Sequence, residues 1–335
     1  MNDIYKYFKN DKPIVYFSGY GFEERAVKLL YIIKSKVSFD YAFTVGFPSS
    51  FLGSTLLWKR NKAFIDDSLA EMTKNYEIID ISIKQPVEVI QNLKEKIEKH
   101  NLDFRNFKTI VDITSFPKST LFMLLKKLVE SNASGYLFYI EPIDYELPIS
   151  LGVKDIRTLP FFGDDYDPKR QKLLIEILGF EGHRAYAIWE VFDPHKTIAL
   201  IGVPSSLNQK WKNISEYENE LLLSRPNVEK REISFASIEE ATNTLEKIYG
   251  EVGSKYNIIV SSLGTKLSAV SLFYFANCHK NVFITFSRPE KHTEHYSYGC
   301  SKMIIIAFNH ESANIIDSYD FKKCEDLVRR SYNGT

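Results

Sequence analysis

The chain has 335 residues, which fits two ordinary domains better than a single small one. Hydrophobic residues make up 44% of it and charged residues 26%, so it has enough apolar surface for two cores and is not a disordered sequence. The 43 Lys and Arg residues balance the 43 Asp and Glu residues, so a nucleic-acid backbone or an anionic membrane would be attracted only by a local patch.

The cysteines and the hydropathy pattern indicate the compartment. Three cysteines, none of them in a CxxC spacing, favour a reducing environment over a disulfide framework. No stretch reaches the ~18 apolar residues that a membrane span needs. We therefore expect a cytoplasmic protein with no membrane partner, no bound metal and no cofactor.

The first half alternates short apolar runs with longer amphipathic stretches, beginning with a strand at 14–17 and a helix at 22–33. Continuous apolar strands that alternate with helices are typical of a parallel sheet covered on both faces. The sequence therefore predicts an α/β, doubly wound, Rossmann-like domain over residues 1–160. Its other expected elements are strands at 41–45, 76–83, 109–113 and 135–140 and helices at 87–99 and 118–129.

A loop-rich segment with an acidic cluster at 164–168 follows this domain. We expect a helical linker over 161–195, with helices at 170–178 and 182–192. A second Rossmann-like domain, again with a mainly parallel sheet, is then predicted over 196–335. Its expected elements are strands at 197–203, 257–261, 282–286 and 303–308 and helices at 217–223, 238–252 and 267–276.

The two predicted domains are related as a tandem repeat. The run at 110–118 and the run at 258–266 are each followed by an apolar helix, an aromatic strand and a glycine. Aligning Thr114 with Ser262 also aligns Lys118 with Lys266. Such a repeat predicts two similar modules about a pseudo-two-fold axis, with equivalent loops that face one another.

Ligands of open parallel sheets bind beyond the carboxyl ends of the strands, so the loops there are the candidate sites. Ser18 and Gly19 follow the first strand, where a hydroxyl would point toward a ligand and a glycine permits a tight turn. Glu23 and Glu24 come next. Carboxylates in a first helical turn also serve as ordinary charges that complement the helix dipole, and this interpretation stays open.

The clearest local signal is the segment from Asp112 to Lys118. A buried strand ends there in a carboxylate and the Thr114 hydroxyl, and Pro117 fixes the entry to a helix with Lys118 in its first turn. A lysine at this place opposes the helix dipole, and a bound anion would account for it. In the alternative interpretation Thr114 or Ser115 caps the helix and Lys118 is merely solvated.

The Asp-x-Thr-x-x-x-Lys pattern of these residues resembles the ligand loop of CRISPR-associated Rossmann fold (CARF) domains and of the related fused-tandem SAVED sensors. The resemblance implies that Thr114 and Lys118, with Ser262 and Lys266, contact the backbone of a cyclic oligonucleotide. It also implies that the polar residue after each first strand completes the site; Ser18 and Ser205 stand in these positions. Val260 departs from the pattern, because it occupies the place of Asp112 in the second half.

The resemblance further implies a sensor of a nucleotide second messenger in prokaryotic antiviral defence. An effector would then be a partner chain, and a homo-oligomer is also compatible with it. One alternative is a metal-independent ring nuclease that stabilises the developing charge with lysine and serine. Another is a scaffold subunit of a defence complex. The same residues serve binding and cleavage, so the sequence assigns no catalytic residue.

Weaker signals occur elsewhere in the second half. Arg288 and His292 follow a predicted strand and are candidate phosphate or base contacts. His292, His295 and Cys300 do not have the HExxH spacing, so a polar loop is the preferred interpretation over a zinc site. The segment at 179–185 echoes the one at 21–26, but it precedes the predicted strand at 197–203, and we interpret the echo as coincidence.

Overall fold

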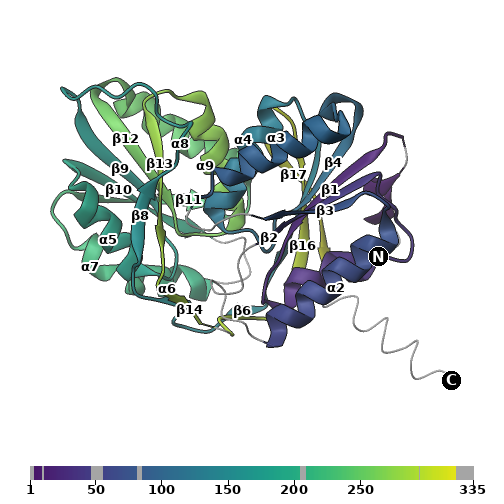
Figure 1. The fold of residues 1–335 in the computed structure, drawn as a ribbon. Helices are drawn as coiled ribbons and strands as arrows, with labels where there is room; N and C mark the ends of the chain where they lie inside the picture. The colour runs from purple at the N-terminus through teal and green to yellow at the C-terminus, as the bar shows by residue number, and fades with distance from the viewer. Residues whose placement is uncertain are drawn as a thin grey trace. The chain divides into compact units, whose positions relative to one another are not determined.

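The computed structural model describes residues 4–9, 11–46, 56–80, 85–203, 209–293 and 295–321. The chain forms two compact units. Unit 1 contains residues 1–146 and 297–335, and unit 2 contains residues 147–296. Each unit is a Rossmann-like, doubly wound α/β structure built on a mainly parallel sheet (Figure 1). The predicted fold class is therefore confirmed.

The sheet of unit 1 has the strand order β17-β16-β5-β4-β1-β2-β3. Its first five strands in the chain are parallel to one another, whereas β16 is antiparallel to β5 on one side and to β17 on the other. The central strand β1 is buried along its whole length, as expected of a strand covered on both faces. The strands are β1 (Ile14–Gly19), β2 (Tyr41–Gly46), β3 (Tyr76–Asp80), β4 (Lys108–Asp112), β5 (Gly135–Glu141), β16 (Lys302–Phe308) and β17 (Ala313–Asp320).

Helices connect these strands. Helix α4 is an apolar helix whose buried residues pack beside α3. The helical elements of unit 1 are η1 (Ile4–Phe8), η2 (Glu24–Val27), α1 (Lys28–Ile33), α2 (Leu56–Met72), α3 (Glu88–His100), η3 (Phe104–Asn106) and α4 (Lys118–Glu130). A small ribbon, β6 (Asp144–Tyr145) paired with β15 (Ser297–Tyr298), completes the unit.

The sheet of unit 2 repeats this design, with the order β11-β10-β9-β12-β13-β8. Strands β9 to β13 are parallel, and β8 is antiparallel to β13. The strands are β8 (Asp155–Thr158), β9 (Gln171–Ile177), β10 (Lys196–Val203), β11 (Val228–Ser234), β12 (Tyr256–Ser262) and β13 (Val282–Arg288). The ribbon pairs β7 (Ser150–Leu151) with β14 (Lys291–His292).

The helices of unit 2 pack in two groups, α8 on α9 and α5 on α6 and α7. Helix α8 begins at an N-cap, Ser237, whose hydroxyl accepts from the backbone N–H of Glu240 at 3.2 Å. The helical elements are α5 (Gly182–Phe192), α6 (Gln209–Glu218), α7 (Glu220–Leu223), α8 (Ile238–Val252), η4 (Gly253–Lys255) and α9 (Lys266–Cys278).

The predicted helix at 170–178 is wrong, because this segment is strand β9 in the middle of the second sheet. Its residues from Leu173 to Ile177 are buried, so the strand has the continuous apolar run of a doubly covered sheet. A single acidic residue, Glu176, interrupts that run and gives it a helix-like amphipathic pattern. The expected helical linker at 161–195 is thus part of unit 2, and β9, not β10, is the first of that unit's parallel strands.

The two repeats exchange their sixth strands. Strand β8 follows β1 to β5 along the chain but pairs with β13 of unit 2. Strand β16 follows β9 to β13 but pairs with β5 of unit 1. In Figure 1 the yellow strands β16 and β17 lie in the same sheet as the purple β1. The unit boundaries therefore fall at 146/147 and 296/297 rather than at the expected 160 and 196. The prediction from sequence order placed β8 in the first domain and β16 in the second.

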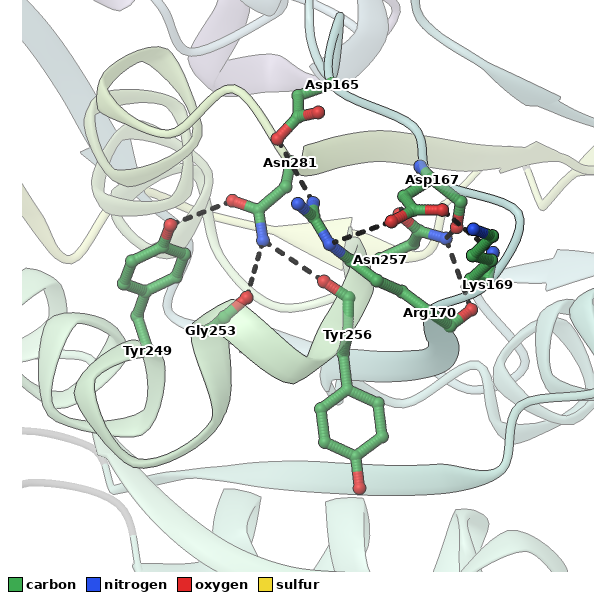
Figure 2. A network of polar contacts seen from close by, with 9 residues as sticks. All are labelled: Asp165, Asp167, Lys169, Arg170, Tyr249, Gly253, Tyr256, Asn257 and Asn281. Atoms are coloured by element: carbon green, nitrogen blue, oxygen red, sulfur yellow. Dashed lines mark hydrogen bonds and ion pairs between the residues drawn. The ribbon is translucent and has the colours of Figure 1, made fainter.

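A polar network fastens the segment before β9 to the start of β12 (Figure 2). The buried Asn257 amide donates to the backbone carbonyl of Asp167 at 2.7 Å and accepts from its N–H at 3.1 Å. Asn281 donates to Gly253 at 2.7 Å and accepts from the Tyr249 hydroxyl at 2.8 Å. These bonds lie at the amino ends of β12 and β13, so they secure the edge opposite the candidate ligand loops.

Within the described ranges, no helix has both the length and the apolar character that crossing a membrane requires.

Candidate functional site

Two predicted site residues of unit 1 end neighbouring strands. Ser18 lies next to the end of β1, and Asp112 ends β4. Both side chains are buried, and the Ser18 hydroxyl lies 3.2 Å from that of Thr44 on β2. Gly19 closes β1 against the Phe116 ring, and a Cβ there would be 3.5 Å from that ring, an ordinary contact. The structure therefore brings these residues to the carboxyl edge of the sheet.

The loop after β4 is held by hydrogen bonds of its own polar residues. The Asp112 carboxylate accepts from the backbone N–H of Thr114 at 3.0 Å, and the Thr114 hydroxyl accepts from the N–H of Ile140 at 3.1 Å. Burial raises the pKa of Asp112 to about 6, although its hydrogen bonds with Thr114 and the charge of Arg25 oppose the rise. Asp112 is thus a structural acid of the loop, because both the backbone and the side chain of Thr114 hydrogen-bond to it.

Each unit has a lysine as the first residue of a 13-residue helix directly after its fourth strand. Lys118 begins α4 and Lys266 begins α9, and both side chains are half-buried. Pro117 at the N-cap of α4 offers no side-chain hydrogen bond, whereas Thr265 caps α9 by accepting from the N–H of Ser268 at 3.3 Å. Neither helix has an acidic residue in its first turn.

The loop after the first strand of unit 1 has an internal ion pair. Arg25 pairs with Glu23 at 2.6 Å and donates to the backbone carbonyl of Ile140, at the end of β5, at 2.8 Å. Asn61 on α2 donates to the carbonyls of Gly21 at 3.0 Å and of Glu23 at 2.9 Å. All three polar side chains are largely buried, so they fix the path of this loop.

Unit 2 repeats the main contacts of this loop. Arg184 pairs with Glu181 at 2.7 Å and donates to the backbone carbonyl of Ser287, at the end of β13. Asn219 donates to the carbonyl of Gly179 at 2.8 Å and follows that glycine by 40 residues, the same separation as Asn61 from Gly21. The shared contacts confirm that the two units are structural repeats.

The sequence echo between 21–26 and 179–185 is therefore no coincidence. It follows the first parallel strand in both units, because β9 is the first parallel strand of unit 2. The same finding corrects the position of Ser205, which lies after β10, the second strand. Ser205 itself is outside the described residues. The residue that precedes the repeated glycine by three positions, as Ser18 precedes Gly21, is Glu176.

Glu176 is a fully buried acid whose two carboxylate oxygens have no hydrogen-bond partner. Burial raises its pKa well above the usual range of a glutamate, with the charge of Arg184 opposing the rise. Unit 1 places its buried acid on the fourth strand, at Asp112, where unit 2 has Val260. In unit 2 the buried acid near the repeated arginine stands on the first strand instead, so the departure at Val260 does not leave that unit without one.

The other two predicted contacts of unit 2 have intramolecular partners. The Ser262 hydroxyl lies 3.1 Å from that of Ser268 in α9. The guanidinium of Arg288 forms an ion pair with Asp155 of β8 and is 7% exposed. The equivalent pair in unit 1 has the charges reversed, with Lys302 of β16 at 3.5 Å from Glu141 of β5. Arg288 therefore ties the exchanged strand to the sheet, and its role as a ligand contact stays a prediction.

Among the residues that the structure describes, no three His, Cys, Asp or Glu side chains gather where they could hold a metal ion. His292 lies in the ribbon strand β14, and Cys300 is partly exposed.

Comparison with known proteins gives structural likeness but no family. No protein-family model matches the chain, and no curated protein matches it. A universal stress protein from Archaeoglobus fulgidus DSM 4304 is similar over 82% of this chain and 97% of its own, with 11% sequence identity and a TM-score of 0.24. A likeness this low carries no argument about function.

Proposed function

We propose that this protein binds a cyclic oligonucleotide through the loops at the carboxyl edge of each sheet, and that binding regulates a partner chain in antiviral defence. The observation that carries the proposal is the repeated lysine. Lys118 and Lys266 each open a long helix directly behind a buried fourth strand.

A lysine at a helix start adds to the positive charge of that end and makes it attractive to an anion. The first backbone N–H groups and the positive end of the helix dipole already attract negative charge, so a nearby ammonium group is unfavourable by itself. A phosphate at that point accepts from the backbone N–H groups and neutralises the lysine. Both repeats have a lysine at this position, Lys118 and Lys266. Six positions earlier the repeats differ, with Asp112 in the first and Val260 in the second.

The hydroxyl groups of the same edge would complete the contacts. Thr114 and Ser262 lie four residues before the lysines, and Ser18 stands on the neighbouring first strand. Each hydroxyl has an intramolecular neighbour that fixes its position, and a hydroxyl can both donate and accept. The lysines would supply charge, and the positioned hydroxyls would supply directed hydrogen bonds to phosphate oxygens.

Calorimetry tests the proposal. Cyclic di-, tri- and tetranucleotides are titrated into the wild type and into Lys118→Ala. We expect at least one ligand to bind the wild type and to bind the variant at least about tenfold more weakly, since a charge-assisted contact contributes ~1.5–3 kcal/mol. No binding to the wild type, or equal binding to both, would reject the site.

A bound ligand also separates a sensor from a ring nuclease. The ligand is incubated with the protein in the presence of a chelator, and the products are separated by chromatography. A sensor returns the cyclic compound intact, whereas a metal-independent nuclease returns linear products.

A further inference from the structure

The two first-strand loops are held by hydroxyl groups that come from exchanged segments. In unit 1, the Ser297 hydroxyl donates to Glu23 at 2.5 Å. In unit 2, the Ser150 hydroxyl donates to Glu181. Ser297 belongs to β15 and Ser150 to β7, the two ribbon strands that the repeats exchange. Each loop therefore depends on a serine that the other repeat supplies.

The two ribbons are copies of one element. In both, a glycine stands two residues after the serine with a left-handed backbone, φ +65° at Gly152 and φ +66° at Gly299. A Cβ at Gly152 would lie 2.7 Å from the Glu290 side chain, and one at Gly299 would lie 2.5 Å from Ile143. The same bend and the same close approach occur in each ribbon, so glycine is required at both positions.

The ribbons are also joined along the chain. Strand β6 in unit 1 leads through residues 146–149 to β7 in unit 2, and β14 in unit 2 leads through residues 293–296 to β15 in unit 1. Each ribbon pairs only two residues per strand, and a two-stranded ribbon of this length is not stable alone. Its order must come from its anchors, which are the serine–glutamate bonds and the adjacent backbone hydrogen bonds.

We infer that the crossed ribbons couple the two loops, so that loosening the serine–glutamate bond in one unit also loosens the loop in the other. The coupling acts in both directions, because a free energy shared between two sites is reciprocal. Its consequence for ligand binding, namely that occupancy of one unit stabilises the loop of the other, rests on the proposed function.

Hydrogen exchange monitored by mass spectrometry tests the coupling without any ligand. In Ser297→Ala we expect exchange to accelerate about tenfold in residues 20–27 of unit 1, and to accelerate measurably in residues 178–186 of unit 2. Ser150→Ala should give the mirror image. The control is Ser224→Ala, which removes an exposed hydrogen bond to Leu221 and should leave both loops unchanged.

Acceleration confined to the loop beside the substituted serine in both variants would overturn the inference. Global unfolding would appear as exchange in β4 and β12 as well. In that case Ser297→Cys and Ser150→Cys, which keep the side-chain shape with a weaker donor, replace the alanine variants and are judged by the same criterion.

A second arm adds a cyclic tetranucleotide to Lys266→Ala, which keeps only the lysine of unit 1. Slower exchange in residues 178–186 on binding supports the coupling. Binding that protects unit 1 alone contradicts it. If the wild type binds and this variant does not, Lys266 is a ligand contact as proposed, and the ligand-free result decides the coupling.

Discussion

Glu176 on β9 lies opposite Ser261 on β12, and the polar side-chain atoms of both residues are buried without a hydrogen-bond partner. On its other side, Glu176 lies opposite Ala199 of β10, which offers no polar group. An ionised carboxylate in such surroundings is costly, so burial raises the pKa of Glu176 and favours its protonated form. We therefore expect a neutral acid in the core of the second sheet.

The protonation of Glu176 predicts a pH-dependent stability. The unfolded chain releases this proton near the ordinary pKa of ~4.3, whereas burial raises the pKa in the folded protein. The folded state therefore loses stability as the pH rises above the unfolded pKa, by at most about 1.4 kcal/mol per pH unit. Glu176→Gln lacks this loss, so its advantage over the wild type should grow between pH 5 and pH 8.

Urea unfolding across this pH range measures the effect. Glu190→Gln, at an exposed glutamate on the same helix as Arg184, is the control and should follow the wild type. Parallel stability curves for the wild type and Glu176→Gln would show that Glu176 is ionised in the folded state.

Glu77 has the opposite dependence. Burial alone would raise its pKa, but hydrogen bonds from Lys96, Lys99 and His100 lower it to about 2. The carboxylate thus stabilises the fold above its unfolded pKa, and this contribution is lost as the pH falls toward 2. Glu77→Gln should lower the unfolding free energy at pH 7 by about 1 kcal/mol, since solvent screens these surface cations. The difference from wild type should vanish at low pH, and Glu95→Gln, at an exposed position of α3, should show none.

The repeated asparagines should contribute equally to the two units. Asn61→Ala and Asn219→Ala each remove donors from a buried glycine carbonyl, so each should lower the unfolding free energy by ~1–3 kcal/mol in urea titrations. Asn213→Ala, at an exposed position of α6, should change it by less than ~0.5 kcal/mol. If only one of the two buried asparagines differed from this control, the functional equivalence of the repeats would fail.

Two glycines of unit 2 should respond in opposite ways to alanine. A Cβ at Gly179 would lie 2.1 Å from the backbone carbonyl oxygen of Leu263, whereas a Cβ at Gly250 in α8 meets nothing within 4 Å. Gly179→Ala should therefore cost ~1–3 kcal/mol, because two backbone segments must separate. Gly250→Ala should stabilise the protein by ~0.4–1 kcal/mol through the unfolded chain. Thermal unfolding of both variants measures the signs, and equal signs would contradict this account of the loop packing.

Hydrophobic periodicity predicted many of the elements, but it missed α2, β11 and β17 and mistook β9 for a helix. The helix at 182–192 is α5, the helix at 238–252 is α8, and the strand at 282–286 lies within β13. Strand β9 was missed because the buried acid Glu176 gives an apolar strand the look of a helix. That error moved the first strand of unit 2 to β10, so Ser205 replaced Glu176 as the match of Ser18.

The exchange of strands could not be predicted from the order of the elements along the chain. Nothing local distinguishes β16 pairing with β5 from β16 pairing with β13, since both partners are apolar strands that precede a ribbon. The charges carry a signal in retrospect. Glu141 matches Lys302, and Arg288 matches Asp155, so each exchanged strand complements the sheet it joins. By contrast, the helices that begin with a lysine could be predicted from Pro117, Lys118 and their spacing.

The most direct test of the ligand site is a calorimetric titration of the double variant Lys118→Ala/Lys266→Ala with the cyclic oligonucleotide that binds the wild type. Its control is Lys127→Ala/Lys280→Ala, which removes one lysine at or just beyond the opposite end of each helix. We predict that binding disappears in the first double variant and is unchanged in the control. Equal affinity in both would contradict the claim that the two helix starts hold the phosphates.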